Sequence, residues 1–258
     1  MRVPVVQHRS RRRRALRRRA LWTGGEFLVT AGVVLLLLVV HELWWTNREA
    51  RQGAEHQVQA LERQWATPGA VSGDTPSANS GLAGGSSPRR STSVDGSTTV
   101  PGSAATPHRS QAYAILTIPR LHLRVPIAEG VSKQNVLNKG YVGHYPGTQQ
   151  PGQAGNFALA GHRNTHGEPF RYLPRLRLKD TVQVETRTTV FTYTVDKILP
   201  QTSAADSGVI RPVPRSTVKP AYGYSRPGYY VTLTTCTPEF TSRYRMVVWG
   251  TLTSTRLR

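Results

Sequence analysis

The most apolar stretch of the chain runs from Phe27 to Val40 and contains no charged residue. By itself it is too short to span a bilayer, which needs about 20 residues of helix. Adding the apolar and aromatic residues on both sides gives Leu21–Trp45, which would reach ~37 Å at ~1.5 Å per residue. Tryptophan stands near both ends of this segment, as is common at membrane–water interfaces. The pattern therefore predicts a transmembrane anchor over residues 21–45.

The segment after the predicted anchor has two parts of different composition. Between Asn47 and Trp65, apolar residues recur at helical spacing, which indicates a short juxtamembrane helix. These residues are Ala50, Ala54, Val58, Leu61 and Trp65. Residues 67–110 consist mostly of Ser, Gly, Pro, Thr and Ala and cannot bury a core, so they predict a flexible coil with a reach of roughly 35–40 Å. We therefore expect residues 46–110 to be a juxtamembrane segment and flexible linker that holds the next domain away from the membrane.

From residue 111 onward the pattern changes to short β-type runs. The expected strands cover residues 112–118, 123–130, 156–162, 181–186, 190–195, 229–235 and 245–252. Residues 181–186 and 190–195 alternate between apolar and polar, so they should pair as a hairpin. A short helix is expected over residues 168–173, whereas residues 203–227, with four prolines, show no clear strand pattern. Many short strands with little helix predict an all-β barrel or sandwich, and about 148 residues suffice for one such core.

The charge of the chain is strongly positive and unevenly distributed. The formal net charge is +20, and residues 1–19 hold nine arginines and no acidic residue. By the positive-inside rule, residues 1–20 should be a basic cytoplasmic tail, and the domain after the anchor should lie outside the cell. Because the arginines abut a predicted span, binding of nucleic acid by the tail is not expected. A cleaved signal peptide is an alternative to the anchor, but no small-x-small cleavage site follows Trp45.

Cys236 is the only cysteine of the chain. Exported proteins usually use cysteine in pairs, as disulfides. A single cysteine leaves three possibilities: an intermolecular link, a buried bystander or a reactive thiol. The preceding run, Tyr229–Thr235, is predicted to be a strand that ends at this thiol.

A thiol nucleophile needs a nearby base or cation, because the thiolate is the reactive form. Four of the eight histidines fall in the predicted β-domain: His122, His144, His162 and His166. His162 stands out because it follows an apolar strand and a glycine, although such a histidine can equally be structural. Arg245 opens an apolar strand that would return beside Cys236 if the two strands pair, and Arg243 would then lie on the loop. Both arginines could instead be solvated surface residues.

Three motifs together resemble those of the sortases, the membrane-anchored cysteine transpeptidases of Gram-positive surfaces. They are Ala160-Gly161-His162-Arg163, Thr232-Leu233-Thr234-Thr235-Cys236 and Arg245-Met246-Val247-Val248. The similarity extends from about Gln111 to Arg258 and keeps the family's order of His, Cys and Arg. The cysteine block followed by an arginine that opens the next apolar strand is specific, whereas Gly-His alone is weak. Two further runs look most like class E sortases: Trp44-Trp45-Thr46-Asn47 and Gly143-His144-Tyr145-Pro146-Gly147-Thr148.

The resemblance implies a fold and a reaction. The fold would be a closed eight-stranded β-barrel with short helices, preceded by one transmembrane helix, and residues 111–258 would be the catalytic domain. Cys236 would attack the carbonyl between Thr and Gly of a C-terminal sorting signal of the LAxTG or LPxTG type. The protonated His162 would donate to the leaving amine, and Arg245 would orient the substrate and stabilise the oxyanion.

Two further residues are candidate substrate contacts. Tyr145 matches the tyrosine that class E sortases are credited with using to prefer Ala over Pro after the leading Leu of the signal. It could equally be a turn residue that packs beside Pro146. Thr235, which directly precedes the nucleophile, is a second candidate contact.

The expected partners are secreted proteins that bear a sorting signal, a peptidoglycan-precursor amine of the lipid II type, and the membrane, but no nucleic acid. Acidic residues are scattered through the domain, unlike the calcium-binding loops of some class A sortases, so neither a metal nor another cofactor is expected. A non-enzymatic, membrane-tethered surface-binding module is a competing hypothesis. It would use the +12 charge of residues 111–258 (19 Lys and Arg against 7 Asp and Glu) and would bury Cys236. A papain-like hydrolase also pairs Cys with His, but it places the cysteine before the histidine and on a helix.

Overall fold

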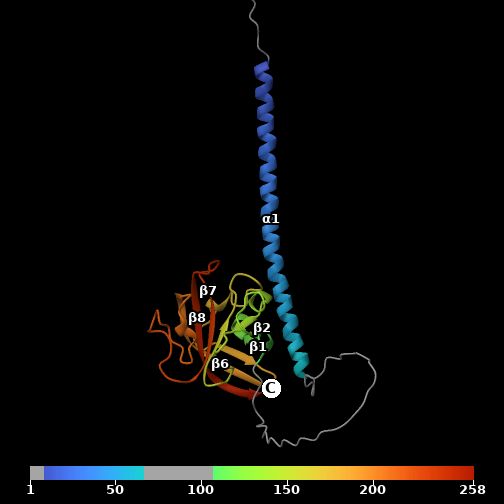
Figure 1. Ribbon diagram of the computed structural model, residues 1–258. Coiled ribbons are helices and arrows are strands. Elements are labelled where there is room, and N and C mark those ends of the chain that lie inside the picture. The colour runs from blue at the N-terminus through green and yellow to red at the C-terminus, as the bar shows by residue number, and fades with distance from the viewer. Residues whose placement is uncertain (1–8, 67–106) are drawn as a thin grey trace, which may run out of the picture.

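The computed structural model describes residues 9–66 and 107–258. It consists of one long helix, α1 (Arg9–Ala66), and a β-domain that lies beside the C-terminal part of that helix (Figure 1). The predicted anchor and the predicted juxtamembrane helix are both contained in α1. The start of the basic tail and most of the predicted linker fall outside the described residues.

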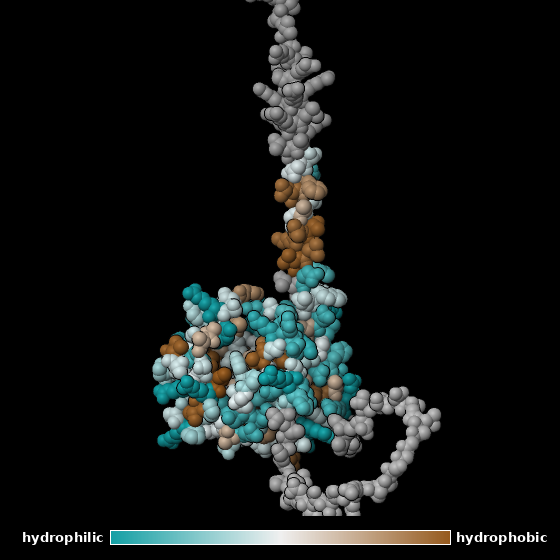
Figure 2. All heavy atoms as spheres, in the orientation of Figure 1, coloured by the Kyte–Doolittle hydropathy of each residue, from teal (hydrophilic) through white to brown (hydrophobic). Residues whose placement is uncertain are grey.

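The middle of α1 is apolar and uncovered. Every side chain from Trp22 to Glu42 is exposed, and Figure 2 shows the apolar residues as a band that ends where the helix meets the β-domain. A helix of this length and composition is able to cross a membrane. In a membrane these exposed side chains would contact lipid tails, which are equally apolar, instead of water.

Eight strands and four short 3₁₀ turns make up the β-domain. The strands are β1 (Ala112–Ile118), β2 (Leu123–Glu129), β3 (Val142–His144), β4 (Gly155–Ala160), β5 (Thr181–Glu185), β6 (Thr189–Ser203), β7 (Tyr229–Thr237) and β8 (Tyr244–Leu257). The turns are η1 (Pro119–Leu121), η2 (Leu137–Lys139), η3 (Leu173–Arg175) and η4 (Ser207–Ile210). Every strand expected from the sequence is present, and the predicted β5–β6 hairpin is confirmed by its antiparallel ladder.

The strands close into a barrel in the order β1-β2-β3-β4-β7-β8-β6-β5. Two pairs are parallel, β2 with β3 and β4 with β7, and the remaining pairs are antiparallel. Closure leaves no unpaired sheet edge. The predicted eight-stranded barrel is therefore confirmed, and the parallel β4–β7 pair brings two segments that are distant in sequence side by side.

The two faces of the barrel wall have separate hydrophobic clusters. The interior is filled from all strands, with Phe157, Leu233 and Val248 among its buried side chains. Because side chains alternate along a strand, neighbouring residues of β8 point outward. Trp249 is one of them: it is 0% exposed and packs in a second cluster with Val209 from the long connection between β6 and β7. That connection therefore covers part of the outer face of the barrel.

One expected element is absent, the short helix over residues 168–173. The segment forms turns, and only Leu173–Arg175 is a 3₁₀ turn. Glu168 has φ +53°, in the left-handed region, where a non-glycine residue costs about 1–2 kcal/mol. A right-handed helix cannot begin at such a residue, so this prediction was wrong.

The C-terminal part of α1 docks on the barrel. The residues that recur at helical spacing face β1 and β2, and Val58 and Leu61 are buried against Ile115. Each of these aliphatic side chains stabilises the contact by about 1.5–3 kcal/mol when fully buried. At the end of the helix the guanidinium of Arg258 lies 4.7 Å over the ring of Trp65. Docking places the barrel directly beside the end of the apolar segment, not at a tether's length from it.

Candidate active site

Cys236 and Arg245 lie opposite each other on neighbouring strands. They are paired positions in the antiparallel β7–β8 ladder. On the other side of β7, Ala160 pairs with Thr234, and the next amide, Gly161, donates to the Thr234 carbonyl at 3.2 Å. Strand β4 ends at Ala160, and His162 follows two residues later in the loop on this side of β7.

Strand alternation turns the side chains of Cys236 and Arg245 to the same side of the barrel wall. Val231 and Leu233 of β7 belong to the interior cluster, so Cys236, an odd number of residues further on, faces outward. Trp249 places Arg245 on that outer face by the same argument. Cys236, His162 and Arg245 are all partly exposed. The structure thus places Cys236 and Arg245 opposite each other, and His162 follows the end of β4 at the same end of the β4–β7–β8 wall.

The strand end that carries Cys236 is fixed by a cation that the sequence reasoning did not assign. Arg163 donates to the Cys236 carbonyl at 3.2 Å and to the Thr237 hydroxyl at 2.9 Å. This arginine directly follows His162, so it ties the histidine loop to the cysteine strand. The thiol itself is free.

His162 is held by two groups, neither of which is acidic. Its Nε2 lies 3.0 Å from Oδ1 of Asn138, and its ring stacks on that of His166 at a centroid distance of 5.4 Å. An amide oxygen only accepts, so Nε2 carries the proton and Nδ1 is the basic nitrogen of the neutral ring. Burial, followed by the nearby His166 and Lys133, lowers the pKa of His162 to about 4. The resting ring is therefore neutral near pH 7, and the lowered pKa makes it a weaker base than an ordinary histidine.

The two arginines after Cys236 have different surroundings. Arg245 donates to the carbonyls of Ser242 at 2.9 Å and Tyr244 at 3.0 Å. It also lines a cavity of about 220 Å³ on the outer face. Arg243 is exposed and lies over the ring of Tyr244 at 5.2 Å. Only Arg245 is presented toward a cavity.

Tyr145 contributes to the wall of the same cavity. Its hydroxyl lies 3.0 Å from that of Thr234, which in turn donates to the Leu159 carbonyl at 3.1 Å, so Tyr145 is the donor of the first bond. Its own carbonyl accepts from Thr148 at 2.8 Å in a tight turn. Tyr145 is therefore both a turn residue and a lining residue.

Thr235 faces the opposite way. It is 2% exposed and donates to the Gly161 carbonyl at 2.9 Å. In this structure it does not line the outer cavity; it holds β7 against the end of β4. The cavity lining includes Thr234, one residue earlier, which the sequence reasoning did not single out.

The far wall of the cavity is the β6–β7 connection, residues 204–228, and Asp206 organises it. This carboxylate accepts from the Thr202 hydroxyl at 2.6 Å, from the Ser216 hydroxyl, and from the amide and hydroxyl of Thr217, both at 2.9 Å. Burial alone would raise the pKa of Asp206, but the hydrogen bonds outweigh it and lower the pKa. In the sequence this aspartate looked like one more scattered acid. Its three hydroxyl partners, Thr202, Ser216 and Thr217, all lie within eleven positions of Asp206 in the sequence, and they were the available signal.

Within residues 9–66 and 107–258, no three His, Cys, Asp or Glu side chains gather as a metal-binding group. The polar groups at the site are instead a thiol, an imidazole and a guanidinium. That set supports nucleophilic attack with proton transfer and anion stabilisation.

The chain is similar to known proteins over most of its length. Residues 116–253 match the Sortase domain family. The chain is 43% identical over 239 residues to sortase SrtE1 of Streptomyces coelicolor, a match that covers 91% of this chain and 57% of SrtE1. It is 33% identical over 236 residues to sortase SrtE2 of the same organism, covering 90% of this chain and 81% of SrtE2.

Solved structures give the same result. A crystal structure of sortase E1 from S. coelicolor with a tripeptide in the active site has a TM-score of 0.55 and 50% identity, covering 59% of this chain and 94% of that one. A structure of sortase E from Streptomyces avermitilis has a TM-score of 0.52 and 41% identity, covering 58% and 93%. These relatives agree with the class E features seen in the sequence. The matched residues, the closed barrel and the sortase E relatives together establish that the chain belongs to the sortase family.

Proposed function

We propose that this protein is a cysteine transpeptidase that joins sorting-signal proteins to a cell-wall amine. The observation that supports the proposal is the register, which pairs Cys236 with Arg245 and ends β4, two residues before His162, beside Thr234 of the cysteine strand. The family supports the reaction class, and the chemistry of the three side chains supports their roles.

The acylation step follows from the protonation state of the site. Neutral His162 accepts the proton of the Cys236 thiol, and the thiolate attacks the carbonyl carbon between Thr and Gly of the signal. The guanidinium of Arg245 stabilises the negative charge on the carbonyl oxygen. The intermediate collapses when the C–N bond breaks and His162 returns its proton to the leaving amine. The products are a thioester on Cys236 and a released peptide that begins with Gly.

The second half of the reaction restores the enzyme. An amine of a peptidoglycan precursor attacks the thioester and loses a proton to His162, and the C–S bond breaks. The thiolate then recovers that proton, so no proton is gained or lost over the cycle. No oxidant or metal is needed for this sequence.

The same proposal assigns a location. The nine arginines before the apolar segment favour a cytoplasmic N-terminus, which puts the barrel outside the cell. Signal-bearing exported proteins and lipid-linked wall precursors would both be present there. Residues 1–20 are then the cytoplasmic tail, 21–45 the anchor and 111–258 the catalytic domain.

Tyr145 is proposed to contact the residue after the leading Leu of the signal. It lines the outer cavity beside Arg245, and the related sortase E1 of S. coelicolor has been solved with a tripeptide in its active site. We propose an LAxTG-type signal as the preferred substrate, with LPxTG as the weaker one.

The test uses the full chain in detergent with Leu-Ala-x-Thr-Gly and Leu-Pro-x-Thr-Gly peptides and an amine. Mass spectrometry should detect cleavage between Thr and Gly, an acyl adduct on Cys236 and a ligated product. Cys236→Ala should reduce product to background, since no other thiol exists in the chain. Turnover by that variant at the wild-type rate would end the proposal. Failure of maleimide to label the folded protein would favour the competing surface-binding module.

A further inference from the structure

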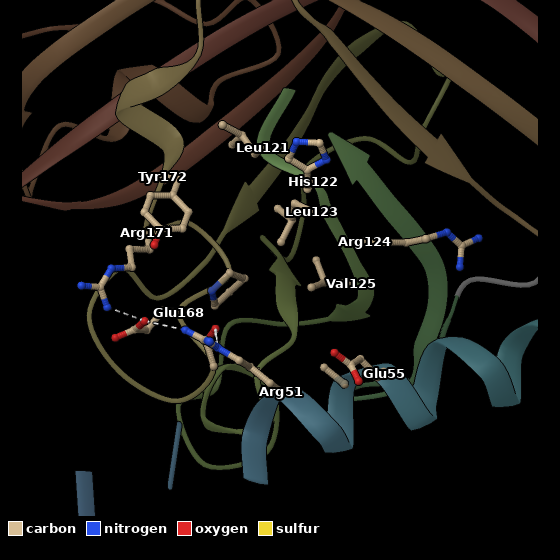
Figure 3. A pocket seen from close by; sticks show the side chains of 14 residues that line it. Arg51, Glu55, Leu121, His122, Leu123, Arg124, Val125, Glu168, Arg171 and Tyr172 are labelled. Atoms are coloured by element: carbon tan, nitrogen blue, oxygen red, sulfur yellow. Dashed lines mark hydrogen bonds and ion pairs between the residues drawn. The ribbon is translucent and has the colours of Figure 1, made fainter. Parts of the chain in front are cut away.

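Two side chains of α1 hold the loop that carries His162. In the His162 loop, defined as residues 161–172, the Gly167 amide donates to Asn47 Oδ1 at 3.2 Å, and Asn47 Nδ2 donates to Glu168 at 3.1 Å. Arg51, one helical turn later, donates to the Gly167 carbonyl at 3.1 Å and to Glu168 at 2.8 Å. Figure 3 shows Arg51 reaching from α1 to Glu168, which also accepts from Arg171. Both peptide groups of Gly167 are therefore bonded to α1.

This stretch of the His162 loop needs external support. His166, Gly167 and Glu168 have φ values of +52°, +82° and +53°. Left-handed conformations at non-glycine residues persist only where the surroundings fix them. The Glu168 side chain is also 4% exposed, and a buried carboxylate needs cationic or donor partners. Asn47 and Arg51 supply both the backbone bonds and part of the charge compensation.

The supported stretch is in direct contact with His162. The His166 ring stacks on the His162 ring, and the Phe170 amide donates to the His162 carbonyl at 2.9 Å. A change at residues 166–168 would therefore alter the packing of the catalytic imidazole on one side.

The hydrogen-bond partner on the other side of the ring also touches α1. Asn138 belongs to the η2 turn, which contacts α1. Two residues later, Gly140 is so close that a Cβ atom there would lie 2.6 Å from the Ala50 carbonyl oxygen. One turn of α1, from Asn47 to Arg51, thus braces the loops that supply both ring contacts of His162.

We propose that Asn47 and Arg51 are positioning residues for His162, so that the helix leaving the membrane forms part of the active site. The inference rests on the proposed role of His162 as the proton carrier. It predicts that catalysis depends on the juxtamembrane turn of α1 even though neither residue lines the cavity beside Arg245.

The experiment compares full-length variants in detergent micelles, at a temperature where circular dichroism shows each to be folded. The double variant Asn47→Ala/Arg51→Ala should lower kcat about tenfold to a hundredfold, because small misplacements of a catalytic group have effects of that order. Its KM should change by less than about threefold, since a positioning residue acts on the chemical step. The limb of the pH–kcat profile that belongs to His162 should also move toward the ordinary histidine value as the ring loosens.

The matched control is Glu62→Gln, which removes the 2.9 Å ion pair with Arg124 at the far end of the same helix–barrel contact. It should keep the wild-type kcat and pH profile. A wild-type kcat and pH profile in the double variant would overturn the inference, and so would an equal loss in Glu62→Gln. Wild-type cleavage by His162→Ala would instead overturn the proposed function on which the inference rests.

Discussion

The two irregular segments that flank Cys236 are stabilised in opposite ways. The β6–β7 connection has its own acidic brace: three of the four hydrogen bonds to the buried carboxylate of Asp206 come from Ser216 and Thr217 within the connection, and the fourth comes from Thr202 of β6. The His162 loop has its own acidic residue, Glu168, but two of the side chains bonded to it come from α1. One wall of the site is thus self-contained, and the other is completed by a helix more than 100 residues away in sequence.

The difference indicates that the two walls have separate roles. The self-contained wall lines the cavity next to Arg245 and Tyr145, where a peptide would lie. The externally braced wall carries the residue that would move protons. Binding and proton transfer should therefore respond separately to mutation.

Among the substitutions that test this comparison, the one at Arg245 is expected to have the largest effect. Arg245→Ala should lower kcat/KM by about 100- to 1,000-fold, as loss of an oxyanion-stabilising group does. The pH dependence should stay unchanged, since the His162 loop is untouched. Peptide cleavage across a pH series measures both. Arg243→Ala is the control and should stay within about twofold; the opposite ranking would show that the wrong arginine was assigned.

An intermediate effect is expected from removing the internal brace. Asp206→Ala leaves buried hydroxyl donors without their acceptor, which should lower the free energy of unfolding by about 2–4 kcal/mol. KM should rise because the cavity wall loosens, whereas kcat at saturating peptide should fall less. Thermal unfolding and steady-state kinetics on the same preparations measure these changes. Asp180→Asn, which removes a charge from an ion pair with Arg120 elsewhere on the barrel, should leave KM unchanged. Equal KM values in both variants would contradict a role for the connection in binding.

The smallest expected effect is a change in the free energy of unfolding at acidic pH. Well above pH 6.5 His162 is neutral in the folded and unfolded states, and it contributes no pH dependence there. Between pH 6.5 and about 4, His162 binds a proton in the unfolded chain but stays neutral in the folded protein. The free energy of unfolding therefore falls as pH falls. The pKa of Asp206 is lowered, so its contribution is lost only below the ordinary aspartate range.

The measurement is the unfolding temperature of the full chain at pH 8 and pH 5. His162→Gln should reduce the acid-induced drop by about 2–4 °C, the shift that ~1 kcal/mol produces in a domain of this size. An identical drop in the variant would mean that the histidine wall is no more acid-sensitive than the Asp206 wall.

The pattern of apolar and polar residues was enough to predict seven of the eight strands, because each strand of the barrel buries one face in the interior; the three-residue strand β3 was not predicted. The expectation that His162, Cys236 and Arg245 lie together came from the resemblance to sortases, because the residue pattern alone left each of them a structural alternative. Their positions depend on register, and register is what a period of two specifies.

The same reasoning missed features that depend on distant partners. The left-handed run at His166 to Glu168 is stabilised by Asn47 and Arg51, so local propensity favoured a helix that is not formed. The inward orientation of Thr235 required knowing which face of β7 is covered. Helical spacing identified the docking face of α1, but nothing in the sequence named β1 and β2 as its partner.

An unbroken helix from the apolar segment into the docking face has a geometric consequence. At ~1.5 Å per residue, Asn47 and Arg51 stand only about 3 and 9 Å beyond Trp45 along the helix axis. The distance of the site from the apolar segment and its rotation about the helix axis are therefore fixed by α1. While α1 stays docked, the length of chain between Ala66 and the barrel adds nothing to the reach of the site.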